Sequence, residues 1–104
     1  MVSLICPVYN EEKYIKHILD FYMQLPQPGK EIIFADGGSP DNTASIIEEY
    51  AGRCNGIKLL HNPNRYVSFA LNLAIKECTH PIIIRLDAHT EYSSDYTEKI
   101  LKVF

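Results

Sequence analysis

The sequence predicts an α/β fold in which a parallel sheet carries helices on both faces. Four short apolar runs alternate along the chain with segments whose apolar residues recur at helical spacing. The connections between them are short and rich in glycine, proline, asparagine and aspartate. Such an alternation of strand and helix is typical of a parallel sheet with right-handed crossovers. The 104 residues are expected to form one domain.

The predicted strands are the four apolar runs. They cover residues 2–6, 31–36, 57–60 and 82–86. Pro7 is expected to end the first strand, because proline cannot donate a hydrogen bond to a sheet. The first strand is the most apolar, so we expect it at the centre of the sheet. The second strand should lie beside it and the fourth on its other side.

The predicted helices begin at residue types that cap helix N-termini. These positions are Asn10, then Asp41 or Asn42, then Ser68, and finally Ser94 or Asp95. Apolar residues at helical spacing then define one buried face for each helix. In chain order, those faces are Tyr14, Ile15, Ile18, Leu19 and Tyr22; Ile46, Ile47 and Tyr50; Ala70, Leu71, Ala74, Ile75 and Cys78; and Tyr96, Ile100, Leu101 and Phe104.

Composition and charge argue against some classes of binding partner and indicate a cellular compartment. A net charge of -3 and a pI near 5.7 give no support to a nucleic-acid-binding or anionic-membrane surface. No apolar run approaches the length of a transmembrane helix. Cys6, Cys54 and Cys78 are odd in number and lack CxxC spacing, which fits a reducing compartment. We therefore expect a cytoplasmic protein, or one at the cytoplasmic face of a membrane if the chain is part of a longer protein.

Polar residues at the carboxyl ends of the strands mark the expected ligand site, because ligands of open parallel sheets bind there. Asp36 ends the second strand, and Asp87 and His89 follow the fourth. In extended backbone, residues two apart point to the same side. A carboxylate and an imidazole could together hold a divalent cation, with manganese favoured over magnesium. The alternative is a polar turn in which Asp87 is a cap and His89 a loop residue.

The glycine fingerprints of common nucleotide sites do not occur. Neither G-x-G-x-x-G nor G-x-x-x-x-G-K-[ST] is present, which argues against a dinucleotide-dependent oxidoreductase. Gly37-Gly38 lacks the lysine and predicts a turn. A divalent cation bridging a diphosphate would then take over the role of a phosphate-binding loop.

Three further observations concern the same sheet edge, each with an alternative. Asp36 could accept a hydrogen bond from the imide N–H of a uracil, or form an Asx-turn closing on Gly38. Tyr9 could stack on a base or pack locally. Arg65 could pair with phosphate or lie in solvent.

The competing class of protein is a regulatory, non-catalytic α/β module. Such modules usually carry a lysine late in the sheet and acids after the first and third strands, and this sequence has neither feature.

Four blocks of the sequence occur in the order and spacing of a known family. They are residues 2–12 (VSLICPVYNEE), 31–43 (EIIFADGGSPDNT), 62–73 (NPNRYVSFALNL) and 84–92 (IRLDAHTEY). Together they resemble the family 2 glycosyltransferases of the GT-A fold, whose nucleotide-binding half is Rossmann-like. Within that family, the segment Asp87-Ala88-His89-Thr90 looks most like enzymes of bacterial exopolysaccharide assembly.

The resemblance implies a UDP- or GDP-linked sugar donor and a glycan or lipid-linked acceptor. The positions that it assigns to nucleotide binding are Pro7, Tyr9, Glu11, Asp36, Arg65, Asn72 and Asp87. Asp87-Ala88-His89 stands where most members carry Asp-x-Asp, the metal and diphosphate motif. Asp87 and His89 are therefore the implied ligands of Mn²⁺ or Mg²⁺.

The resemblance also implies that this chain is part of a larger catalytic domain. Family domains are longer, and their second half supplies the acceptor surface and, in inverting members, the catalytic carboxylate. No residue after Tyr92 can be assigned that role. We therefore expect residues 1–104 to be the N-terminal, donor-binding part of a longer glycosyltransferase domain. An exposed partner surface on such a part could lead to homo-oligomers.

Overall fold

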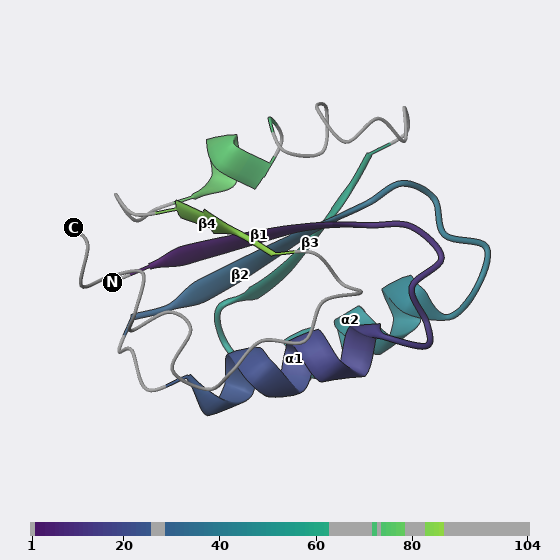
Figure 1. The fold of residues 1–104 in the computed structure, drawn as a ribbon, viewed down its shortest axis with the longest axis horizontal. Coiled ribbons are helices and arrows are strands. Elements are labelled where there is room, and N and C mark those ends of the chain that lie inside the picture. The colour runs from purple at the N-terminus through teal and green to yellow at the C-terminus, as the bar shows by residue number, and fades with distance from the viewer. Residues whose placement is uncertain (1, 26–28, 63–71, 73, 79–82, 87–104) are drawn as a thin grey trace.

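Four parallel strands form one sheet in the computed structural model, which describes residues 2–25, 29–62, 72, 74–78 and 83–86 (Figure 1). The elements are β1 (Ser3–Val8), α1 (Ile15–Gln24), β2 (Glu31–Asp36), α2 (Thr43–Arg53), β3 (Ile57–His61) and β4 (Ile83–Arg85). All pairings are parallel and the strand order is β3-β2-β1-β4. The predicted fold class and the predicted neighbours of β1 are confirmed.

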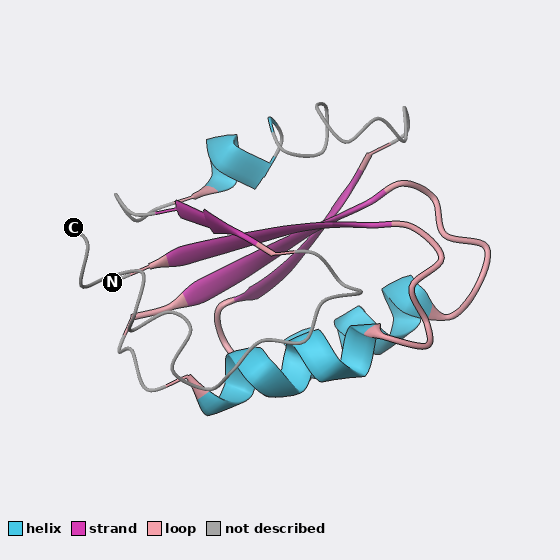
Figure 2. Ribbon diagram, viewed as in Figure 1, coloured by secondary structure: helices cyan, strands magenta, loops and turns pink. Residues whose placement is uncertain are grey.

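Helices cover both faces of the sheet, as predicted (Figure 2). On one face, α1 and α2 cover the larger core, which includes Leu4, Cys6, Ile32 and Phe34 from the strands. The next residues along the same strands point the other way. On that second face, Ile5 and Ile33 pack with Ala74, which belongs to a helical segment of which residues 72 and 74–77 are described. No helix within the described ranges is both long and apolar enough to cross a membrane.

Pro7 does not end β1, which continues to Val8. The carbonyls of Val2 and Val8 accept hydrogen bonds from the β2 side, whereas the carbonyl of Ile5 accepts one from Leu86 on the β4 side. Because the bonding direction alternates along a strand, Pro7 faces the same side as Ile5. Its missing N–H therefore removes no hydrogen bond between β1 and β2, and the strand tolerates it.

Helix α1 begins later than predicted, at Ile15. Asn10 is not its cap, because its backbone has a positive φ of 56°. The carbonyl of Glu11 instead accepts bonds from the amides of Tyr14 and Ile15, both at 2.9 Å, in a turn that leads into the helix. The predicted buried face is confirmed from Ile15 onward, but Tyr14 is 45% exposed.

Helix α2 begins close to its predicted start. Asn42 precedes it without a side-chain capping bond, whereas the Asp41 carboxylate accepts the amide of Thr43 at 3.0 Å. Ile47 is buried, and Ile46 and Tyr50 are partly buried and pack against the core.

The remaining predictions fall late in the chain. Ile75 is 47% exposed rather than buried, so that prediction is wrong. The predicted helix start at Ser68 and the whole helix from residue 94 lie outside the described residues.

At the amino edge of the sheet, the end of α1 contacts Lys30, the residue that precedes β2. Lys30 Nζ donates to the carbonyl oxygens of Tyr22 at 2.6 Å and Leu25 at 2.7 Å, at the end of α1. The hydroxyl of Tyr22 donates to the carbonyl of Lys30 at 3.0 Å. Burial, with smaller contributions from Cys54 and Glu31, raises the pKa of Tyr22 to about 12. This hydroxyl therefore stays a neutral donor over the ordinary pH range.

Gly56 lies against this contact, and its replacement is expected to destabilise the fold. Its φ is +97°, and an added Cβ would lie 2.6 Å from Tyr22 Oη and 3.0 Å from the Lys30 carbonyl oxygen. Gly56→Ala should lower the free energy of unfolding by about 1–3 kcal/mol, measured by urea denaturation. Gly52→Ala is the matched control, because Gly52 lies in α2 with no atom within 4 Å of its Cβ position. That control should gain about 0.5–1 kcal/mol, and equal losses in both variants would contradict the argument.

Candidate functional site

The candidate site lies at the carboxyl edge of the sheet, where β1, β2 and β3 end side by side. Val8 is the register partner of Asp36, and Asp36 is the partner of His61. Two backbone bonds continue the pairing past the strands, from Gly37 N to Val8 O at 3.0 Å and from Asn62 N to Asp36 O at 2.7 Å. The loops after β1 and β2 leave this edge together (Figure 1).

Hydrogen bonds join these two loops directly. Three successive backbone amides of the first loop donate to side chains of the second. The bonds run from Asn10 to Ser39 Oγ at 2.9 Å, from Glu11 to Thr43 Oγ1 at 2.8 Å and from Glu12 to Asp41 Oδ2 at 3.0 Å. The amide of Asn42 returns a bond to Glu12 Oε1 at 2.9 Å. We call these four bonds the interloop network.

Asp36 forms a turn, which is one of the two roles that the sequence left open for it. Its side chain is buried, with the residue 3% exposed, at the end of β2. Its carboxylate accepts the Ser39 amide at 3.2 and 3.3 Å, and its Oδ1 accepts the Ser39 hydroxyl. The turn therefore closes on Ser39 rather than Gly38. Among the described residues, Oδ2 receives only the Ser39 amide, so this oxygen retains acceptor capacity for a ligand.

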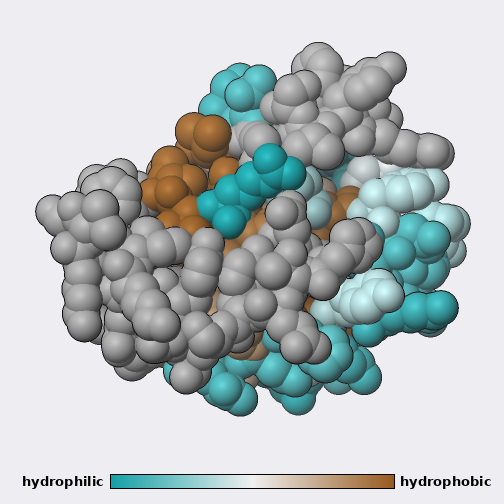
Figure 3. Space-filling view, in the orientation of Figure 1, coloured by the Kyte–Doolittle hydropathy of each residue, from teal (hydrophilic) through white to brown (hydrophobic). Residues whose placement is uncertain are grey.

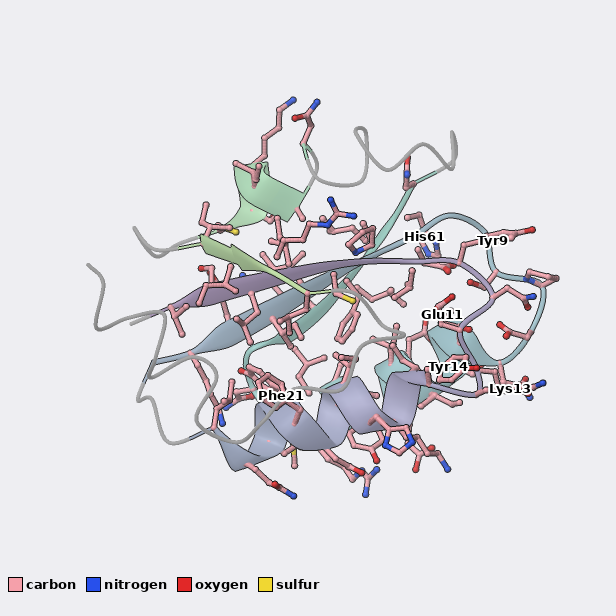
Figure 4. All side chains as sticks on the ribbon, in the orientation of Figure 1. Tyr9, Glu11, Lys13, Tyr14, Phe21 and His61 are labelled. Carbon is pink, nitrogen blue, oxygen red and sulfur yellow. The ribbon has the colours of Figure 1, made fainter. Side chains whose placement is uncertain are left out.

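Tyr9, Glu11 and His61 lie at the same end of the sheet as Asp36 (Figure 4). Tyr9 is 38% exposed, whereas Glu11 is 7% exposed beneath the interloop network. Pro7 directly precedes this edge, opposite Ala35. The surface at this end is hydrophilic, whereas apolar surface gathers over β4 and the helical segment near it (Figure 3).

Of the four site residues predicted in the later part of the chain, the structure describes only Asn72. Asn72 is exposed in the helical segment on the second face, and no hydrogen bond joins it to Asp36 in the described part of the chain. Arg65, Asp87 and His89 lie outside the described residues. Leu86, which precedes Asp87, donates its amide to the Ile5 carbonyl at 2.8 Å, so β4 remains paired with β1 up to that point. Across the described ranges, no three His, Cys, Asp or Glu side chains come together as a metal site.

Sequence reasoning missed three contributors to this edge. Ser39 and Thr43 each accept one bond of the interloop network, and His61 lies beside Asp36 at the end of β3. His61 could have been identified from the sequence, because it directly follows an apolar run, as Asp36 does. For Ser39 and Thr43 the sequence indicated only a turn and a helix start. Their bonding partners are 29 and 32 residues away and could not be predicted from local sequence.

The charge on Asp41 supports the network. Burial by itself would raise the pKa of this carboxyl, but the bonds from the Thr43 hydroxyl and amide and from the Glu12 amide lower it below its ordinary value. The Thr43 hydroxyl lies 2.6 Å from Asp41 Oδ1 and also accepts the Glu11 amide. Ionised Asp41 is therefore favoured by folding.

Asp41 should make stability depend on pH. Because the pKa is lowered in the folded state, its stabilising contribution is complete above the unfolded-state pKa of about 3.9 and disappears as pH falls through the folded-state value. In urea titrations, the difference between the unmodified chain and Asp41→Asn should be constant from about pH 7 to 5 and shrink below about pH 4. Thr43→Val should weaken this dependence and Thr43→Ser should preserve it. A difference that grows on acidification would contradict the assignment.

The comparisons with known proteins agree with this architecture. The family model described as Glycosyl transferase family 2 matches residues 3–104. A glucuronosyltransferase of Methanococcus voltae, which by its name acts on dolichyl N-acetyl-alpha-D-glucosaminyl phosphate, is 32% identical over 99% of this chain and 33% of its own length. The succinoglycan biosynthesis protein ExoA of Rhizobium meliloti (strain 1021) is 31% identical over 95% of this chain and 31% of its own length.

Solved structures have the same fold. A mannosyltransferase from Pyrobaculum calidifontis, in complex with GDP-Man and Mn²⁺, has a TM-score of 0.85 and 27% identity over 97% of this chain and 31% of that one. S. aureus TarS, in complex with UDP, has a TM-score of 0.79 and 23% identity over 98% and 31%, which supports the fold alone.

The family model and these relatives match nearly the whole chain. The chain spans about a third of the length of these curated relatives, 33% and 31%. The family match argues against the oxidoreductase and regulatory-module alternatives, because one family model accounts for residues 3–104. The chain belongs to glycosyl transferase family 2.

Proposed function

We propose that this chain binds the nucleotide of a UDP- or GDP-linked sugar donor, as the N-terminal part of an enzyme that transfers the sugar to a glycan or lipid-linked acceptor. The observation that carries this proposal is the buried carboxylate of Asp36 at the carboxyl edge of the sheet. Its Oδ2 retains acceptor capacity, which suits an N–H of a base. The proposal assigns Asp36 the recognition of the base.

The residues of the first loop have complementary roles in this proposal. Tyr9, 38% exposed beside this edge, offers a ring for stacking on the base. Pro7 and Glu11 shape the base and ribose pocket, with the loop backbone held by the interloop network. Arg65 and Asn72 are assigned to the nucleotide by their family positions. The acceptor-activating base of the reaction is assigned to no residue of this chain.

Asp87 and His89 are the proposed ligands of a divalent cation. One carboxylate oxygen and one imidazole nitrogen form a donor set that suits Mn²⁺ better than Mg²⁺. A bound cation would neutralise charge on the diphosphate leaving group. Support for a metal comes from the Pyrobaculum calidifontis mannosyltransferase, which was crystallised with Mn²⁺.

The proposed cellular role is supported by a relative's name and by the cysteines. The relative named for succinoglycan biosynthesis supports a role in exopolysaccharide assembly. Cys6, Cys54 and Cys78 are free thiols, which fits the reducing cytoplasm or the cytoplasmic face of a membrane. Self-association of the chain is part of the same proposal, through surface that further sequence would cover.

Loss of the Asp36 carboxylate should weaken nucleotide binding. Asp36→Ala should lower affinity for UDP or GDP by about 1–3 kcal/mol, or about 5- to 150-fold, in calorimetric titrations. Ribose 5-phosphate, which lacks the base, should bind the variant and the unmodified chain equally. Asp20→Ala, an exposed acid on α1, is the control and should change neither titration. Equal losses for both ligands would show that Asp36 does not read the base.

The metal assignment has its own test. Mn²⁺ should strengthen binding of the nucleoside diphosphate, and Asp87→Asn should abolish that increment. His89→Asp should shift the preference from Mn²⁺ towards Mg²⁺, because an oxygen replaces an imidazole. A titration indifferent to metal in the unmodified chain and in both variants would reject Asp87 and His89 as metal ligands in this chain.

A further inference from the structure

The hydroxyl of Ser39 lies between the proposed base-binding carboxylate and the first loop. It donates to Asp36 Oδ1 and accepts the backbone amide of Asn10 at 2.9 Å. A hydroxyl has one proton to donate and lone pairs to accept, so both bonds can exist together. Ser39 thus joins Asp36, at the end of β2, to the residue that follows Tyr9.

Ser39 also determines how the Asp36 carboxylate is oriented. Its amide spans both oxygens at 3.3 and 3.2 Å, and its hydroxyl binds Oδ1 alone. A carboxylate held by two donors from one residue has little freedom to rotate. The orientation that results leaves Oδ2 as the less occupied oxygen.

The backbone at Asn10 is held by the bond to Ser39. Asn10 has a φ of 56°, in the left-handed region that asparagine enters more readily than other non-glycine residues. A loop residue keeps this conformation where surrounding contacts hold it. The bond to Ser39 is such a contact. It fixes the loop immediately after Tyr9.

We propose that Ser39 is a positioning residue of the donor site, which orients Asp36 towards the base and holds the Tyr9 loop at a fixed distance from it. This inference rests on the proposed function of Asp36. Ser39 itself needs no contact with the nucleotide. Its effect on the base passes through Asp36, and its effect on the loop through the Asn10 amide.

Nucleotide titrations of Ser39→Ala and Ser39→Thr test the first effect. Ser39→Ala should weaken binding of UDP or GDP by about three- to tenfold, the effect of one hydrogen bond, and leave ribose 5-phosphate unchanged. Ser39→Thr keeps the hydroxyl and should restore most of the affinity. Ser45→Ala, an exposed serine on α2, is the matched control and should have no effect.

A double-mutant cycle separates action through Asp36 from general loosening of the loops. In an Asp36→Ala background, Ser39→Ala should cause a clearly smaller loss of nucleotide affinity than in the unmodified chain, because only its effect through the Asn10 amide and the Tyr9 loop remains. If Asp36→Ala does not fold, Asp36→Asn replaces it in the cycle. An additive loss in either background, or an equal loss for ribose 5-phosphate, overturns the positioning role while leaving the proposed function intact.

Hydrogen exchange of the Asn10 amide tests the bridge without any ligand. Ser39→Ala should accelerate exchange of this amide, whereas Ser39→Thr and Ser45→Ala should not. Unchanged exchange in Ser39→Ala overturns the bridge. If the unmodified chain binds neither UDP nor GDP while the exchange result is as expected, the proposed function fails and Ser39 is only a structural link between the loops.

Discussion

The carboxyl edge of the sheet depends on hydrogen bonds that cross between two loops. The amides of residues 10–12 leave the regular pattern of β1 before α1 begins, so a neighbouring strand no longer supplies their acceptors. Ser39, Asp41 and Thr43 supply those acceptors from the next loop. Side chains accept these bonds because no strand is in register with the amides. The result is a shaped edge whose backbone is held without continuing the sheet.

The two edges of the sheet satisfy their buried polar groups in opposite ways. At the amino edge, the buried Glu31 accepts the Ser3 hydroxyl at 2.5 Å and pairs with Lys58 at 3.3 Å. Its charge is thus balanced within the protein, as buried charges require. At the carboxyl edge, Asp36 is equally buried, but its partners come from the neutral Ser39. The amino edge therefore balances its buried carboxylate with an ion pair, whereas the described residues of the carboxyl edge hold theirs with neutral donors.

Much of the fold could be predicted because its signals are local. The bounds of β2 were predicted to the residue, and the buried face of α1 was correct from Ile15 onward. Apolar periodicity specifies which face of an element is buried, and alternation of elements specifies a parallel sheet. Asp36 was also identifiable, because an acid that ends an apolar strand is visible in the sequence. Family blocks added the assignment of residues such as Arg65, which periodicity could not provide.

What the sequence by itself determined was therefore the order of the described elements, the strand neighbours and the polar residues at the strand ends. The tertiary structure alone decided that Pro7 belongs to β1, that Asn10 is left-handed rather than a helix cap, and that Ser39 bridges Asn10 and Asp36. Each of these depends on which side of a strand is paired or on partners such as Ser39, 29 residues from Asn10. Local propensity carries no information about such contacts, because they exist only once β1 and β2 lie in register.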